Sequence, residues 1–330
     1  MSDRSPVGLV LGSMLPPEAI AETARQAEQH GFGELWLAED YFFTGGISGA
    51  TAALAATSSI PVGLGIVSAM VRHPALLAME LATMSRAYPG RVMPGIGLGV
   101  PHWLRQMGLY PKSQIGALRE CVTGVRRLLA GEELTEQGDY FTFDQVRLTH
   151  PATEELDLYM GVLGPKLLRL SGEISDGTVV SVLAGVAYLR WLREQVTAGQ
   201  EAAGRAGQPH RIATFALYAV DDDGAKAKQA VRDVTAFYLG AVGPTALTEA
   251  YGVNDQLKDM LERGGAETVA REMPDQWVED LAIAGDPDEC AAKIRAFMDA
   301  GSDSVVLFPV PFERAGELVA STGRDVLPKL

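Results

Sequence analysis

The stretch VGLVLGSMLPPEAIAETARQAEQHGFGELWL (residues 7–37) contains one complete strand–helix–strand pattern. Its first apolar run is Val7–Leu11, and Pro16-Pro17-Glu18 then opens a segment with helical periodicity. One face of that helix collects Ile20, Ala24, Ala27 and His30, and Gly31 closes it. A second apolar run follows at Leu35–Leu37. Continuous apolar runs are typical of parallel strands that are buried on both faces, so the stretch predicts a βαβ unit.

The same pattern repeats along the chain. Apolar runs, most of them next to helix-period sequence, occur at Val7–Leu11, Leu35–Leu37, Val62–Val67, Val92–Ile96, Leu158–Val162, Thr178–Val182, Ile212–Val220 and Ser304–Phe308. Eight βα units are the count of an α/β fold of the (β/α)8 TIM-barrel type, which takes about 250 residues. A doubly wound parallel sheet is the alternative, because a sequence alone does not fix the strand count.

Two segments are longer than barrel connections need to be. Residues 133–148 contain a Gly138-Asp139 turn between β-rich flanks, which predicts a hairpin. Residues 221–286 contain several helical stretches and a Gly264-Gly265 break. We interpret both as insertions at the C-terminal face of the strands that cover the pocket, within one domain that spans residues 1–330.

Charge and cysteine content narrow the function classes. The chain has 28 Lys and Arg against 42 Asp and Glu, a net charge of −14. Such a field repels nucleic acid and anionic lipid, so neither is expected as a partner. Cys121 and Cys290 lie far apart and form no disulfide framework, which favours a reducing cytoplasm. We expect no signal peptide and no membrane span, because no apolar run approaches about 18 residues.

Active sites of barrels lie where the strands end, so the residues after each run are the candidates. After the second run, Glu39 and Asp40 are adjacent carboxylates beside the aromatic residues Tyr41, Phe42 and Phe43. Carboxyl groups near apolar walls can act as general acid or base, which makes Glu39 and Asp40 catalytic candidates. Asp40 is also a candidate for cofactor binding. The alternative is a helix cap with a solvated charge.

Glycines dominate the ends of the third and fourth runs. Gly65, Ile66 and Ser68 end the third and are candidates for cofactor binding. His73-Pro74 after it is typical of a helix start, so His73 is expected to cap that helix. Gly97 and Gly99 belong to a G-x-G-x-G string whose bare backbone would let a flat ring lie against it. Packing of small residues is the alternative there. His102 and Trp103 follow; we expect them on the substrate side, and His102 is a catalytic candidate.

The segment Leu163-Gly164-Pro165-Lys166 connects the fifth run to a helix. Free N–H groups at a helix N-terminus, with Lys166 beside them, predict an anion site. A capped helix with solvated basic residues is the alternative. No metal site is expected, because the chain lacks metal-ligand spacings, and His30, His150 and His210 sit at loop-like positions where we expect them to be solvated.

Taken together, the strings LWLAEDYFFTGG, LGIVSAMVRHPALLAMELATM, GRVMPGIGLGVP, GPKLLRLSGEISDG and GDPDECAAKIRAFMDAGSDSVVLFPV resemble the luciferase-like flavin and deazaflavin oxidoreductases over nearly the whole chain. The similarity is greatest to the branch that uses coenzyme F420. The resemblance implies a (β/α)8 barrel with the cofactor ring in its mouth, F420 as cofactor with FMN as the alternative, and a homodimer.

The resemblance also implies roles for individual residues. Glu39-Asp40 match an acidic-polar pair of the family, which is often Asp-His, and Leu163–Lys166 match the segment that holds the cofactor tail. A non-prolyl cis peptide is expected at Gly65–Ile66, against the ring. Val100 stands where the sugar-phosphate branch has an acidic proton donor, so that role is not carried over and glucose 6-phosphate is not an expected substrate.

Three functional hypotheses remain at this point. The leading one is hydride transfer between a deazaflavin and a small organic substrate with a C=C, C=N or carbonyl/alcohol group. The second is an FMN-dependent monooxygenase, because the same barrel serves both chemistries. The third is a barrel that binds a flavin, or nothing, without turnover.

Overall fold

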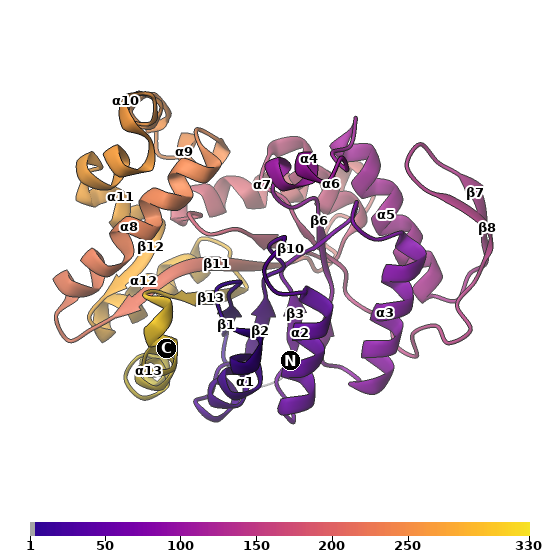
Figure 1. Ribbon diagram of the computed structural model, residues 1–330, viewed down its shortest axis with the longest axis horizontal. Coiled ribbons are helices and arrows are strands. Elements are labelled where there is room, and N and C mark those ends of the chain that lie inside the picture. Colours follow the sequence, from indigo (N-terminus) through magenta and orange to yellow (C-terminus); the bar gives the residue numbers. More distant parts are fainter. Residues whose placement is uncertain (1–3) are drawn as a thin grey trace.

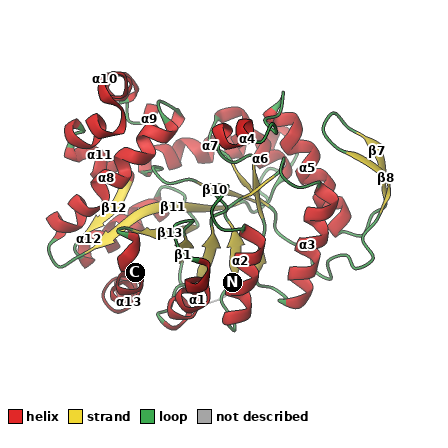
Figure 2. Cartoon of the chain, viewed as in Figure 1, coloured by secondary structure: helices red, strands yellow, loops and turns green. Residues whose placement is uncertain are grey.

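The computed structural model describes residues 4–330. Its main sheet is parallel and curls around a central core, with helices on the outside (Figures 1 and 2). Its strands are β1 (Val7–Leu11), β2 (Glu34–Leu37), β3 (Val62–Leu64), β4 (Val67–Ser68), β5 (Val92–Met93), β6 (Gly95–Gly97), β9 (Tyr159–Gly161), β10 (Gly177–Val180), β11 (Arg211–Val220), β12 (Ala282–Gly285) and β13 (Ser304–Pro309). Strand β1 pairs with both β2 and β13, so the first and last barrel strands are neighbours.

Two barrel strands are interrupted, and this explains how the sheet closes. Segments β3 and β4 are two parts of the third barrel strand, and β5 and β6 are two parts of the fourth. Strand β3 pairs with β5, β4 pairs with β6, and β6 pairs with β9. The parallel ladder therefore runs around the complete ring. The (β/α)8 barrel is confirmed, and each of the eight apolar runs contains a barrel strand.

The helices form the outer layer and part of the C-terminal rim (Figure 1). They are α1 (Ile20–Gln29), α2 (Gly46–Ala56), α3 (Pro74–Ala87), α4 (Pro101–Gln106), α5 (Gln114–Leu129), α6 (Pro165–Ile174), α7 (Val186–Ala202), α8 (Gly224–Val242), α9 (Ala246–Glu249), α10 (Asn254–Glu272), α11 (Asp275–Leu281), α12 (Pro287–Asp299) and α13 (Ala315–Ser321). His73 caps α3 as expected: its Nδ1 accepts the Ala75 N–H at 3.1 Å.

The two long segments differ in where they lie. Residues 133–148 contain the predicted hairpin, made of β7 (Leu134–Gln137) and β8 (Thr142–Val146). The hairpin follows α5 and lies on its outer side, where Glu120 of α5 accepts the Asp139 and Tyr140 N–H groups, both at 3.0 Å. It is thus part of a helix-to-strand connection, and it reaches the starts of α3 and α5, where His73 meets the Phe141 ring and the Tyr140 hydroxyl accepts the Ser113 N–H. Its role as a cover of the pocket stays a prediction. Residues 221–286 hold α8 to α11 and also β12, a strand beside β11 that the sequence pattern did not reveal.

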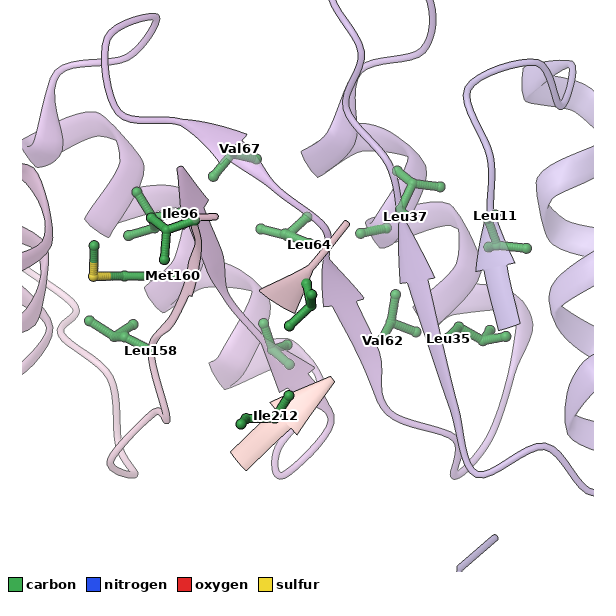
Figure 3. Close-up of a cluster of buried hydrophobic side chains, with 14 of the residues drawn as sticks. Leu11, Leu35, Leu37, Val62, Leu64, Val67, Ile96, Leu158, Met160 and Ile212 are labelled. Atoms are coloured by element: carbon green, nitrogen blue, oxygen red, sulfur yellow. The ribbon is translucent and has the colours of Figure 1, made fainter. Parts of the chain in front are cut away.

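Side chains alternate between the inside of the barrel and its helix layer. Trp36 lies inside, where its ring meets those of Tyr159 at 5.3 Å and Phe215 at 6.0 Å. These rings come from β2, β9 and β11, which are not neighbours in the sheet, so they can meet only in the lumen. Leu35 and Leu37, on either side of Trp36, belong to the outer hydrophobic layer (Figure 3). The barrel is therefore a packed core on both faces of its sheet.

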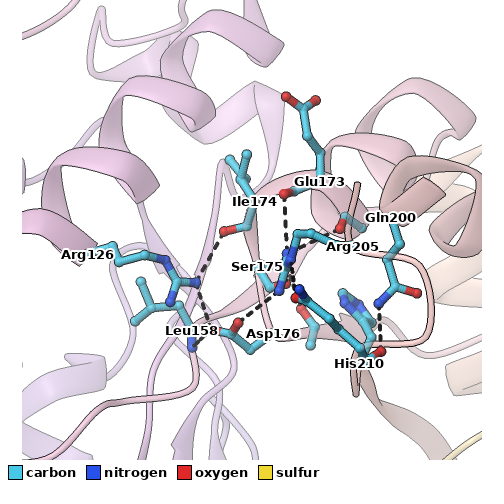
Figure 4. A network of polar contacts seen from close by, with 12 residues as sticks. Arg126, Leu158, Glu173, Ile174, Ser175, Asp176, Gln200, Arg205 and His210 are labelled. Atoms are coloured by element: carbon cyan, nitrogen blue, oxygen red, sulfur yellow. Dashed lines mark hydrogen bonds and ion pairs between the residues drawn. The ribbon is translucent and has the colours of Figure 1, made fainter. Parts of the chain in front are cut away.

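Polar networks tie the strands to the helices near the strand N-termini. Asp176, just before β10, accepts from Arg126 of α5 at 2.6 Å and from the Leu158 N–H at 2.9 Å (Figure 4). His210 lies beside this network and is buried, with its Nε2 2.8 Å from the Thr178 hydroxyl. Burial lowers the pKa of His210 to about 4. The prediction of a solvated histidine is wrong here, because the turn before β11 packs under the barrel.

Candidate active site

Asp40 lies at the carboxyl end of β2, beside the end of β1. The Ser13 hydroxyl, which follows β1, donates a hydrogen bond to Oδ2 of Asp40. Parallel neighbouring strands end at the same edge, so these two loops meet at the barrel mouth. Burial raises the pKa of Asp40, and the Ser13 hydrogen bond opposes this. A carboxyl group in this environment can hold a proton or accept one.

Glu39 is held in a different way from its neighbour. Arg72 donates two hydrogen bonds to its two carboxylate oxygens, at 2.7 and 2.9 Å. The N–H of Gly46, the first residue of α2, donates to Oε2 at 2.7 Å. The Glu39 side chain is only 7% exposed. Its charge is thus compensated, and the arrangement suits it to fixing the β2–α2 loop that carries Asp40.

The ends of the third and fourth barrel strands are tied together at one carbonyl. The Tyr41 hydroxyl donates to the Leu98 oxygen at 2.7 Å, and the Ser68 hydroxyl donates to the same oxygen at 3.0 Å. Burial raises the pKa of Tyr41 to about 12, so it remains a neutral donor. Ser68, a cofactor-binding candidate from the sequence, is fully buried and serves this contact.

The peptide bond Gly65–Ile66 is cis, as the family resemblance implied. The Ile66 side chain packs where the fourth and fifth barrel strands carry glycines. A Cβ at Gly97 would lie 2.7 Å from Ile66, and one at Gly161 would lie 2.6 Å from it. Gly99 has φ +81°, and a Cβ there would lie 2.5 Å from the Tyr41 hydroxyl. Internal packing therefore accounts for Gly97 and Gly99; their contact with a ring stays a prediction.

Gly164 differs from every other glycine in residues 4–330. A Cβ at Gly164 would have no neighbour within 4 Å, and its φ of −85° is open to any residue. All other glycines with open space have φ in the left-handed region. Gly164 precedes α6, whose N-terminus no side chain of the described residues caps. The helices α4 and α7 also begin without a side-chain cap, whereas His73, Ser113, Asp223 and Asp286 cap α3, α5, α8 and α12.

The other residues of this segment fit the same picture. Leu163 is positioned by its carbonyl, which accepts the Tyr188 hydroxyl at 2.6 Å. Pro165 is the first residue of α6 and Lys166 the second, and both are exposed. Uncapped N–H groups, a positive helix end and an exposed ammonium are the groups that the predicted anion site would use. The anion-site prediction is consistent with this geometry.

Aromatic side chains cover the rim near α4. The Trp103 ring lies 5.8 Å from that of Tyr41 and 6.4 Å from that of Phe43. Phe42 and Phe43 are 69% and 55% exposed. His102, on α4, is exposed, and within residues 4–330 no hydrogen bond joins it to Glu39 or Asp40. Its catalytic role stays a prediction, whereas the structure brings Asp40, Tyr41 and Trp103 to one rim.

Sequence reasoning missed three side chains that shape this site. Ser13 and Arg72 both follow barrel strands, so the rule of reading residues after each run would have found them. Tyr238 comes from α8. Burial raises the pKa of Tyr238, and the negative charge of Asp40 raises it further. Nothing in the local sequence of α8 indicates that Tyr238 reaches the mouth, because that depends on how α8 packs over the barrel.

Two further findings bear on the class of site. Within residues 4–330, no three His, Cys, Asp or Glu side chains come together as a metal-binding group. No helix in that part of the chain is long and apolar enough to span a membrane.

Comparisons with known proteins give the family and agree with the fold. A family model described as luciferase-like monooxygenase matches residues 3–304. A 5,10-methylenetetrahydromethanopterin reductase of Methanolobus tindarius is 30% identical over 298 residues, which cover 88% of this chain and 90% of the relative. An F420-dependent glucose-6-phosphate dehydrogenase of Nakamurella multipartita is 28% identical over 327 residues, 95% of this chain and 93% of the relative. The solved coenzyme F420-dependent tetrahydromethanopterin reductase of Methanopyrus kandleri superimposes with a TM-score of 0.86 at 25% identity, over 98% of this chain and 99% of that chain.

Proposed function

We propose that this chain, which belongs to the luciferase-like monooxygenase family, is an F420-dependent oxidoreductase that transfers hydride between the deazaflavin and a small organic substrate. The substrate group is a C=C, C=N or carbonyl/alcohol function. The relatives named above are F420-dependent or pterin reductases and a sugar-phosphate dehydrogenase, so the chain is an enzyme.

Gly164 is the observation that places a cofactor at the start of α6, and the F420-dependent relatives carry the choice of F420 over FMN. Neither backbone conformation nor internal packing accounts for a glycine at this position, so the reason lies in something that approaches from outside. The uncapped start of α6 and Lys166 would hold an anionic group of the cofactor there. When bound, the deazaflavin supplies the two-electron hydride chemistry, and the protein supplies position and proton management.

Asp40 is the residue we assign to proton handling. Its raised pKa and its place at the mouth allow it to hold a proton near the reacting group. The Ser13 hydroxyl orients the carboxyl group through its hydrogen bond. Glu39 is a positioning residue, because both of its oxygens are already engaged by Arg72 and Gly46. The rim around Trp103 and Tyr41 excludes water from one side of the mouth.

The variant Gly164→Ala tests the cofactor site. The added methyl group meets nothing within 4 Å, so the free energy of unfolding should stay the same or rise by about 0.5 kcal/mol through the unfolded state. F420 affinity should fall by at least about tenfold, because the methyl group would meet the cofactor. Urea unfolding and F420 fluorescence titration measure the two effects. Unchanged F420 affinity would remove Gly164 from the cofactor site.

An FMN-dependent monooxygenase is the second candidate, favoured by the description of the matching family model. The two candidates separate by cofactor affinity and by oxygen consumption. An F420 enzyme turns over without oxygen, whereas the monooxygenase requires it.

We further propose that the enzyme is a homodimer in the cytoplasm and that residues 1–330 form one domain. Leu76 and Met79, on one face of α3, are 55% and 49% exposed, which supports burial against a second copy of the same face. Cys121 and Cys290 are free and buried, which supports a reducing compartment.

A further inference from the structure

The first and last barrel strands separate before they reach the mouth. Strands β1 and β13 are in register only as far as Leu9 and Leu307, although β1 continues to Leu11 and β13 to Pro309. A cavity of about 270 Å³ lies beyond that point. Val10, Gly12 and Phe308 line it from the strand side, and Leu15, Thr23 and Ala315 line it from the side of the helices. We call this space the seam cavity.

The seam cavity is mainly apolar. The Phe308 ring packs on the backbone of Gly12, where a Cβ would lie 2.2 Å from the ring, and its centroid lies 5.3 Å from that of the tilted Phe312 ring. An apolar cavity of about 150 Å³ in another protein stays dry and binds benzene. Pockets that take whole drug-sized ligands begin at about 300 Å³. At about 270 Å³, the seam cavity has room for one substituted ring or a branched alkyl group.

The seam cavity shares a wall with the candidate active site. Gly12 and Met14 line it, and Ser13 between them donates its hydroxyl hydrogen bond to Asp40. Phe308 also lines it, and the Phe308 ring lies 6.4 Å from that of Tyr238. Tyr238, on α8, is the residue whose pKa the charge of Asp40 helps to raise. A substrate whose reacting atoms lie at Asp40 can therefore place an attached group in the seam cavity.

Charge selects which groups can enter. Glu313 is exposed and lines the edge of the seam cavity, and the whole chain has a net charge of −14. An anionic group would be repelled at this edge and would lose its hydration among Leu15, Phe308 and Phe312. An uncharged apolar group gains from the transfer.

We propose that the seam cavity is a substrate subsite for an uncharged apolar ring or branched alkyl group attached to the carbon that exchanges hydride. This inference rests on the proposed function, because it gives the substrate class for the same mouth.

Ala315→Leu tests the subsite by filling it from α13. Ala320→Leu, on the same helix and outside the cavity lining, is the matched control, and Thr23→Leu fills the cavity from α1. Xenon pressurised into crystals should occupy the seam cavity of the wild type and of Ala320→Leu, but not of the two filled variants. Benzamide and its anionic isostere benzoate then serve as solution probes. Saturation-transfer NMR measures their binding to the F420-loaded protein.

Benzamide should bind the wild type, bind at least tenfold more weakly to Ala315→Leu and Thr23→Leu, and bind better than benzoate. Glu313→Gln should reduce the difference in affinity between benzamide and benzoate, because it removes the negative charge at the edge of the seam cavity. Xenon absent from the cavity, benzamide affinity unchanged in both filled variants, or benzoate bound as well as benzamide would overturn the proposal. Failure of the proposed function shows differently: xenon would still enter the cavity, but F420 would not bind.

Discussion

At the scale of single residues, adjacent carboxyl groups with the same chemistry have different environments. Asp40 is buried beside one hydroxyl, so burial raises its pKa. Glu39 faces a guanidinium and a backbone N–H, so its charge is compensated. The sequence pair Glu39-Asp40 indicated a functional loop, but it could not tell which carboxylate would find Arg72. The different surroundings of the two carboxyl groups are the reason why we assign proton handling to Asp40 and positioning to Glu39.

The first residue-scale prediction concerns Ser13. Ser13→Ala removes the hydrogen bond that lowers the pKa of Asp40, so that pKa should rise further. The limb of the pH–rate profile that reports Asp40 should move to higher pH. Asp40→Asn should abolish that limb and lower kcat by about 100-fold or more, with F420 affinity little changed. Profiles of wild type and Ser13→Ala that coincide would exclude Asp40 as the titrating group.

A second residue-scale prediction concerns acid stability. His210 has a pKa of about 4 in the folded protein, against about 6.5 for an exposed histidine, so unfolding takes up a proton between these values. The neutral, buried His210 contributes at most about 3 kcal/mol to the free energy of unfolding. This contribution is complete above pH 6.5 and is lost as the pH falls toward 4. Urea unfolding of His210→Gln should show a smaller loss of stability from pH 7 to pH 5 than the wild type. His150→Gln, at an exposed position, should behave like the wild type.

At the scale of elements, Arg72 connects the loop after the third strand to the start of α2. It holds Glu39, and Glu39 in turn accepts the Gly46 N–H at the first residue of α2. The β2–α2 loop, which carries Asp40, is therefore fixed by Arg72, which lies in the loop between β4 and α3. This connection explains why α2 starts at Gly46, before the small-residue stretch Ala50–Thr57 that indicated a helix in the sequence.

The corresponding prediction is a double-mutant test. Arg72→Met should lower the free energy of unfolding by about 3 kcal/mol, because it leaves the buried Glu39 carboxylate without its partner. The double variant Arg72→Met/Glu39→Gln should recover part of that loss, since no charge remains unpaired. Urea unfolding of the wild type, both single variants and the double variant measures the coupling. Additive losses would show that the pair does not act as a unit.

Sequence patterns predicted the strands well and the packing between distant segments poorly. The barrel runs stand out because strands buried on both faces must be apolar throughout. The cis bond at Gly65–Ile66 and the cap at His73 were also expected. The reason for a glycine at position 97 could not be deduced from the sequence. Only the folded chain shows that Ile66 fills the space that a side chain at Gly97 would need. Strand β12 escaped notice for a similar reason: its pairing with β11 is a tertiary contact.

At the scale of the whole molecule, the proposed homodimer would bury the exposed apolar side chains Leu76 and Met79 of α3. Leu76→Glu combined with Met79→Glu should convert the proposed dimer into monomers without lowering F420 affinity, because both residues lie on the outer face of α3. Sedimentation velocity measures the mass. Leu330→Glu, another exposed apolar position, is the control and should leave the dimer intact. A wild type that sediments as a monomer at micromolar concentration would contradict the homodimer.

The most direct test of the account is a titration of the purified apoprotein with oxidised coenzyme F420 and, separately, with FMN, followed by fluorescence. The uncapped start of α6, the exposed Lys166 and the open approach at Gly164 predict binding of an anionic cofactor. The similarity to F420-dependent enzymes predicts that this cofactor is F420 and that FMN binds more weakly. High salt should weaken the binding of F420, because part of it is electrostatic. Tight binding of FMN alone, or binding of neither cofactor, would contradict the assignment of this barrel as an F420-dependent oxidoreductase.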